Sequence, residues 1–189
     1  MATQSDKVTV YIGRFNPFHN GHAHVLKRAL ETSKLVILLL GSAGLARSLK
    51  NPFTFDERKE IIQRWYSDQK LNGQIKMDRT GNFDAPECEL VIAPLRDFPY
   101  NDSHWIRNVQ AMVNGAVGMR RLRNPQIHIT GSDRDSSTWY LNAFPQWKLD
   151  LVSPHRPNGT GELSATRVRE LLLDDVPAEE AAEMVQMMP

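Results

Sequence analysis

The chain has 189 residues, 41% of them hydrophobic and 24% charged, a balance typical of one folded domain and not of a disordered chain. Its 23 Lys and Arg nearly cancel its 22 Asp and Glu, which excludes a general attraction to nucleic acid or to an anionic membrane. The single cysteine, Cys88, permits neither an internal disulfide nor a thiolate zinc site. The longest uncharged apolar stretch, 35–46, is too short to span a membrane, and no signal-peptide core begins the chain. We therefore expect a cytoplasmic protein.

The first forty residues predict a strand, a turn, a helix and a second strand. β-formers predict a strand over 8–12, and apolar residues at helical spacing predict a helix over 21–30. The unbroken apolar run 35–40 is typical of a strand covered on both faces in a parallel sheet. We expect a β-α-β unit here.

The rest of the chain repeats this alternation, which favours an α/β fold with a doubly wound parallel sheet. Thr54 and Glu57 have the spacing of a capping box at the start of a helix. The expected elements are helices over 54–66, 103–113 and 165–173, strands over 90–94, 126–130 and 147–152, and a last helix from Pro177. Residues 68–88 are polar and irregular, and 154–161 form a Pro/Gly-rich loop.

This organisation predicts a single domain over residues 1–189. Its core covers about 8–173, and a C-terminal helical segment covers about 177–188.

The segment GRFNPFHNGH, residues 13–22, stands between the first strand and the first helix. Ligands of open α/β sheets bind beyond the carboxyl ends of the strands, where a helix N-terminus offers N–H groups to phosphate. At this position His19, His22 and Arg14 supply imidazole and guanidinium donors in addition to the backbone N–H groups. The histidines could instead cap a turn while Arg14 lies in solvent, but the strand-loop-helix context favours polyphosphate binding.

These residues resemble the (H/T)xGH signature of the nucleotidyltransferase superfamily. Further segments, GSAGLARSLKNPFTFDER, LRDFPYNDSHW, GSDRDSSTWYLNAFPQW and LSATRVRELL, follow in the family's order. Together they resemble nicotinamide-nucleotide adenylyltransferases, of the archaeal type and of the adenylyltransferase half of bifunctional bacterial enzymes fused to a Nudix hydrolase. The resemblance covers about Val8 to Leu173 and implies a Rossmann-like nucleotidyltransferase fold.

The resemblance also implies roles for particular residues. His19, His22 and Arg169 would contact ATP phosphates and stabilise the transition state. Further ATP contacts are implied for Gly13, Arg14, Phe15, Arg47, Gly131, Asp133, Ser164 and Thr166. Read from the sequence alone, Arg47 could be a solvated loop cation, Ser164 a plain N-cap and 131–134 an ordinary turn.

For the acceptor nucleotide, the resemblance implies Asn101, Asp102 and Trp105, whose indole would stack on the nicotinamide ring. A tryptophan on an apolar helical stripe is more often a core residue, so packing is the alternative. Three departures from the family pattern stand out. Residues 68–88 are longer than the usual connection. Asn16 replaces a usual Gln, which we expect to weaken or shift one contact, and Trp139 replaces a common Tyr.

The implied reaction joins ATP and nicotinamide mononucleotide into NAD and pyrophosphate by in-line attack of the acceptor phosphate on the α-phosphorus. Such chemistry needs positioning and positive charge more than a protein nucleophile. Mg²⁺ is expected to bind through the ATP phosphates, with no protein metal site.

Three alternatives remain at this point: a preference for nicotinate mononucleotide, another acceptor such as phosphopantetheine or a cytidylyltransferase substrate, and a non-catalytic nucleotide sensor. We expect neither nucleic acid nor membrane partners and no pyrophosphohydrolase activity. Relatives are commonly oligomeric, which leaves a homo-oligomer open.

Overall fold

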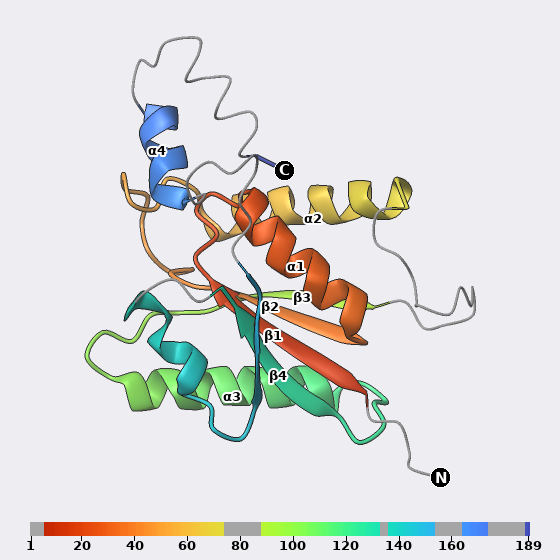
Figure 1. Ribbon diagram of the computed structural model, residues 1–189. Helices are drawn as coiled ribbons and strands as arrows, with labels where there is room; N and C mark the ends of the chain where they lie inside the picture. The colour runs from red at the N-terminus through yellow and green to blue at the C-terminus, as the bar shows by residue number, and fades with distance from the viewer. Residues whose placement is uncertain (1–5, 74–87, 133–135, 154–163, 174–187) are drawn as a thin grey trace.

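The computed structural model describes residues 6–73, 88–132, 136–153, 164–173 and 188–189. Five parallel strands form one sheet in the order β3-β2-β1-β4-β5 (Figure 1). The strands are β1 (Lys7–Gly13), β2 (Leu35–Leu40), β3 (Glu89–Pro94), β4 (Gln126–Gly131) and β5 (Lys148–Leu151). The helices are α1 (Asn20–Thr32), α2 (Phe55–Leu71), α3 (Asp102–Gly118) and α4 (Ala165–Leu173), with a 3₁₀ segment, η1 (Ser136–Asn142).

Helices cover both faces of the sheet. In Figure 1, α1 and α2 lie on one side of the strands and α3 lies on the other. One hydrophobic cluster joins α1 and α2 to alternate residues of β1 and β2, and a second joins α3 and η1 to the opposite residues of the same strands. All six residues of β2 are buried for this reason. The doubly wound parallel sheet predicted from the sequence is confirmed.

The helices run further than their apolar stripes predict. Helix α2 continues to Leu71, so the prediction of irregular chain from residue 68 was wrong for its first turn. Lys70 lies over the Tyr66 ring at 5.1 Å, an i,i+4 contact that favours this added turn. Helix α3 continues to Gly118, and η1 was not predicted. The predicted loop over 154–161 and the helix from Pro177 lie outside the described residues.

The strand order changes direction at β1. The chain moves outward from β1 through β2 to β3, and then returns to the other side of β1 as β4. The segments after β1 and β4, α1 and η1, therefore pack on opposite faces of the sheet, and ligands of open α/β sheets generally bind at such a switch point. Tyr140 of η1 donates a 2.9 Å hydrogen bond to the Ile12 carbonyl, so the segment after β4 is tied to the end of β1.

Cys88 lies just before β3 and has a free thiol. Burial raises the pKa of this thiol to about 12. The Tyr66 hydroxyl donates to the Cys88 carbonyl at 3.0 Å, which ties α2 to the start of β3. A search of the described helices finds none with the length and apolar character needed to cross a membrane.

Candidate active site

The loop between β1 and α1 is shaped by a buried phenylalanine. Phe15 has a positive φ of 49° and is only 1% exposed. Its ring lies 5.0 Å from that of Tyr11 and 4.9 Å from that of His22. A Cβ on Gly13 would come within 2.8 Å of the Phe15 ring, so the turn requires glycine there. The Phe15 side chain is thus a packing residue, and any contact of Phe15 with ATP would come from its backbone.

Both histidines of the loop take part in capping helix α1. His19 is the N-cap, and its Nδ1 accepts a 3.1 Å hydrogen bond from the Gly21 N–H. The Nδ1 of His22 accepts from the His19 N–H at 3.4 Å, and the two rings stack with centroids 3.7 Å apart. The turn-capping role considered for the histidines is therefore present. Because Nδ1 accepts in each ring, the proton of a neutral imidazole stands on Nε2, where it is a donor.

Helix α4 brings Arg169 to the same loop. Its Nη1 donates to the Asn16 carbonyl at 2.9 Å, although the two residues are 153 positions apart. Burial lowers the pKa of Arg169, and the nearby Arg14 charge lowers it further. Two guanidinium groups therefore lie close enough to repel each other, an arrangement that a bound anion would relieve.

The start of α4 is held by local hydrogen bonds. The Ser164 hydroxyl accepts from the Arg167 N–H at 3.1 Å, so Ser164 is an N-cap, as one reading of the sequence predicted. The Thr166 hydroxyl accepts from Arg169 Nη2 at 3.0 Å, which orients that guanidinium. An N-cap and a phosphate ligand are compatible roles at one helix start.

Asn16 ties the loop after β2 to the loop between β1 and α1, here called the histidine loop because it carries His19. The Asn16 side chain donates to the Phe53 carbonyl and accepts from the Phe53 N–H, both at 3.0 Å. These two bonds use both the nitrogen and the oxygen of the side-chain amide, so Asn16 links the two loops. Whether it shifts a contact relative to the family's Gln stays a prediction.

Arg47 forms hydrogen bonds with its own loop and with the first turn of α2. It donates to the Pro52 carbonyl at 2.8 Å and to Glu57 Oε1 at 2.7 Å. The pKa of Glu57 is lowered to about 2, mainly by its hydrogen bond with the Arg47 guanidinium and to a smaller extent by its hydrogen bonds with Thr54. Arg47 is exposed and paired with Glu57, and its contact with phosphate stays a prediction.

The sequence reading missed Arg58, the buried arginine of α2. It is 1% exposed, and it donates to the carbonyls of Thr54 at 3.1 Å and Gly41 at 2.9 Å, and to that of Arg14. A signal was available, because Arg58 shares a helical stripe, at i, i+4 and i+7, with the buried Ile62 and Trp65.

The residues expected at the acceptor lie at the start of α3. Asn101 is the N-cap and accepts from the His104 N–H at 3.0 Å, and the neighbouring Asp102 is exposed. Trp105 is half-buried, with its ring 5.5 Å from that of Trp139 and 6.1 Å from that of Phe144. The packing alternative therefore holds for part of the indole. Gly131 ends β4, whereas Asp133 lies outside the described residues.

Known proteins match most of the chain. Residues 10–170 match the family model described as cytidylyltransferase-like. The chain is 32% identical over 162 residues to a nicotinamide/nicotinic acid mononucleotide adenylyltransferase of Acinetobacter baylyi, a match that covers 85% of this chain and 72% of the relative. The chain belongs to this adenylyltransferase family.

Three further relatives extend the comparison. A nicotinamide-nucleotide adenylyltransferase of Thermococcus sibiricus is 35% identical over 178 residues, covering 90% of this chain and 76% of that one. The crystal structure of a bifunctional NMN adenylyltransferase/ADP ribose pyrophosphatase from Francisella tularensis superposes with a TM-score of 0.69 at 31% identity. That match covers 97% of this chain but 45% of the bifunctional protein. A relative from Methanosphaerula palustris likewise matches over 50% of its own length.

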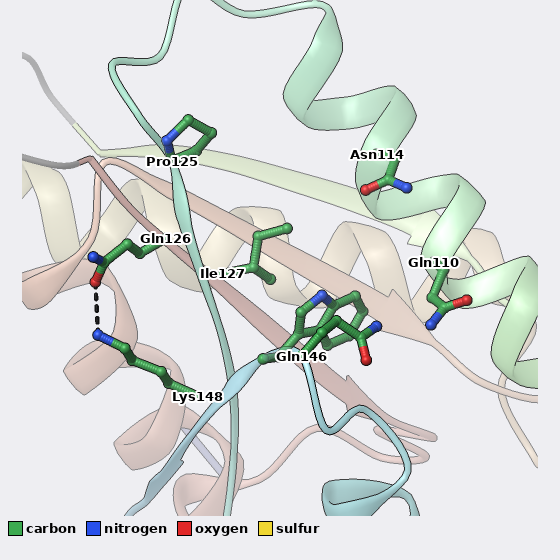
Figure 2. A pocket seen from close by; sticks show the side chains of 8 residues that line it. Gln110, Asn114, Pro125, Gln126, Ile127, Gln146 and Lys148 are labelled. Atoms are coloured by element: carbon green, nitrogen blue, oxygen red, sulfur yellow. Dashed lines mark hydrogen bonds between the residues drawn. The ribbon is translucent and has the colours of Figure 1, made fainter.

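A separate cavity lies away from the loop between β1 and α1. Its volume is about 580 Å³, and it opens between α3 and the beginnings of β4 and β5 (Figure 2). Gln126 and Lys148 begin their strands, and Lys148 donates to Gln126 at 2.8 Å. The histidine loop follows the opposite, carboxyl end of β1. Four of the eight lining residues carry amide side chains and one, Lys148, is a cation, so the cavity offers little of the positive charge that a triphosphate needs.

Proposed function

We propose that this chain transfers the adenylyl group of ATP to nicotinamide mononucleotide, forming NAD and pyrophosphate. One observation carries the proposal most directly. The capped start of α1, with His19 and His22, and the guanidinium of Arg169 meet at one loop. The names and extent of the family matches supply the substrate class.

The residues provide stabilisation of charge rather than a nucleophile. A phosphate oxygen of the mononucleotide attacks the α-phosphorus of ATP, and the bond to the bridging oxygen of pyrophosphate breaks. Negative charge grows on the phosphate oxygens as this occurs. Nε2–H donors of the two histidines, the guanidinium of Arg169 and the N–H groups at the start of α1 would take that charge.

Arg14 and the second helix start complete the proposed triphosphate site. Arg14 supplies a cation beside Arg169, and the N-capped start of α4 offers further N–H groups at Ser164 and Thr166. These groups come from two chain segments, so binding of the triphosphate would itself join α4 to the loop after β1. Arg47, released from Glu57, would add a third arginine from the loop after β2.

We propose that Mg²⁺ arrives with ATP. When bound to the phosphates, it would neutralise part of their charge and favour departure of pyrophosphate. The cationic donors of this site fit oxygens of a phosphate chain, not a metal ion. Within the described ranges, no three or more His, Cys, Asp or Glu side chains gather as a metal cage.

For the acceptor we propose Trp105, with Asn101 and Asp102 beside it at the start of α3. The partly exposed indole offers a flat surface to a pyridine ring, and its buried part is fixed by the neighbouring aromatic rings. Nicotinate mononucleotide is the second candidate, because the Acinetobacter relative is named for both acceptors.

The test is an assay of the purified chain with ATP, Mg²⁺ and each mononucleotide in turn, with dinucleotide and pyrophosphate measured by chromatography. We expect equal amounts of NAD and pyrophosphate from nicotinamide mononucleotide, and no product when Mg²⁺ is chelated. Faster turnover of nicotinate mononucleotide would favour the second candidate. Binding of ATP without product from either acceptor would favour a nucleotide sensor and overturn the proposal.

A further inference from the structure

Arg58 is a cation held away from water by the backbone. Its guanidinium hydrogen-bonds the carbonyls of Thr54, Gly41 and Arg14. Burial lowers the pKa of this guanidinium, and the Asp97 carboxylate opposes the shift. Keeping a charge at 1% exposure carries a desolvation penalty, whereas an apolar side chain would suit the stripe it shares with Ile62 and Trp65. We therefore expect Arg58 to have a role beyond packing.

The three carbonyls belong to three different elements. Arg14 follows β1 in the loop of the histidines, Gly41 follows β2, and Thr54 is the N-cap of α2. The Gly41 N–H also donates to the Gly13 carbonyl at 2.8 Å, so the two loops touch next to Arg58. Arg58 therefore fixes the backbone at Arg14, the residue whose charge lowers the pKa of Arg169.

We infer that Arg58 is a positioning residue for adenylyl transfer: it holds the backbone at Arg14, and with it the loop that enters α1, in the conformation that receives the triphosphate. This inference rests on the proposed function. Preorganised donors stabilise a transition state because they need not reorganise during the reaction. A guanidinium can serve three carbonyls from one plane, whereas a lysine ammonium is a compact charge that cannot span them.

The experiment compares Arg58→Lys, which keeps the charge and loses the fork, with Arg58→Met, which loses both. Arg64→Met is the control for loss of an arginine from α2, since Arg64 is exposed and pairs only with Glu60 among the described contacts. Tyr66→Phe is the control for loss of a stabilising hydrogen bond of α2, because it removes the bond to the Cys88 carbonyl and leaves the three carbonyls that Arg58 binds untouched. Each variant is assayed for kcat and for both KM values, and its thermal unfolding is measured.

We expect both Arg58 variants to lose roughly tenfold or more in kcat and to raise KM for ATP, with KM for the mononucleotide changed little. The two controls should retain kcat and both KM values. Wild-type kinetics in a folded Arg58→Met variant would overturn the inference. Full activity in Arg58→Lys would also overturn it, because charge alone would then suffice. A fall in Tm with unchanged kinetics would mean a merely structural role.

If neither variant folds, wild-type protein labelled with ¹⁵N-arginine gives the answer by NMR. A guanidinium fixed to three carbonyls should show an Nε–H signal that exchanges slowly with water and shifts when ATP is added. Absence of such a signal would overturn the inference. These results differ from a failure of the proposed function, in which the wild-type chain itself makes no NAD.

Discussion

At the scale of single residues, the histidine loop uses each imidazole twice. Nδ1 of His19 and of His22 accepts a backbone N–H and closes the start of α1. This bond sets the tautomer, so the other nitrogen carries the proton that would be donated to phosphate in the proposed reaction. Capping and the proposed catalysis therefore depend on the same side chains, and replacement by alanine would disturb both. A sharper variant keeps the cap and changes only the donor.

Asparagine at position 22 provides such a variant. Its side-chain oxygen can accept from the His19 N–H in place of Nδ1, but it has nothing in the place of Nε2. We expect His22→Asn to lower kcat by roughly 10² or more with little change in Tm, as loss of a preorganised donor does elsewhere. Arg169→Ala should lower kcat by a similar factor.

The matched control is His24→Asn, an exposed histidine on the same helix, which should keep wild-type turnover. Near-normal kcat in a folded His22→Asn or Arg169→Ala enzyme would remove that residue from the proposed catalytic set.

Sequence patterns identified the loop residues more readily than their partners. The order of His19, Gly21 and His22 after a strand predicts a helix start with polar side chains, and the structure places them so. The contacts of Arg58 and of the Asn16–Phe53 pair were not predicted, because a backbone carbonyl acceptor can belong to any residue type. Trp105 shows another limit. Helical spacing predicts a packing residue, but not that part of its ring stays exposed.

At the scale of elements, helices α1 and α2 both begin with a reciprocal capping box. In α2, the Thr54 hydroxyl accepts from the Glu57 N–H at 3.3 Å, while Glu57 accepts from the Thr54 N–H at 2.8 Å. This pair was predicted from its spacing and is confirmed. The C-terminal ends of α2 and α3 were not predicted correctly. Residues beyond the apolar stripe stay helical through local contacts, which the spacing of apolar residues does not reveal.

Removing the cap of α2 should cost stability without changing chemistry. We expect Thr54→Ala to lower the free energy of unfolding by about 1 kcal/mol, measured by urea denaturation, because the Glu57 N–H loses its acceptor. Ser67→Ala, in the exposed last part of the same helix, is the control and should change it by less than about 0.5 kcal/mol. A Thr54→Ala loss no larger than that of Ser67→Ala would show that the cap contributes nothing measurable.

At the scale of the whole molecule, the chain is nearly neutral, yet several of its carboxylates are paired with cationic side chains or backbone N–H groups. The pKa of Asp6 is lowered by the Arg123 N–H and then by Lys34, and that of Glu89 by Arg120. Burial would raise the pKa of Asp150, but hydrogen bonds from Lys7 and His128 outweigh it. Asp6 is 5% exposed and accepts the Arg123 N–H at 2.6 Å, which ties the start of β1 to the approach to β4.

These shifts predict acid lability. Each folded-state pKa lies below its ordinary value of 3.8 or 4.5, so the unfolded chain binds more protons as the pH falls. Stability from these groups is complete above about pH 4.5 and is lost as the pH falls toward 2. We expect the urea midpoint to change little from pH 7 to 5.5 and to drop steeply below pH 4.5.

Asp6→Asn tests the assignment within this set. It should cost about 2 kcal/mol at pH 7, and its difference from wild type should shrink at pH 3. Asp68→Asn, at an exposed position on α2, controls for loss of one negative charge. A constant difference between Asp6→Asn and wild type at both pH values would contradict the pairing of Asp6.

The single thiol has a practical consequence for following this molecule at work. With a pKa near 12, Cys88 carries almost no thiolate at neutral pH, and maleimides react with thiolate. A cysteine introduced at the exposed Glu170 of α4 or His24 of α1, neither of which belongs to the proposed site, would therefore label selectively with Cys88 left in place. Fluorophores at these two positions would report on the distance between α4 and α1 while nucleotide binds.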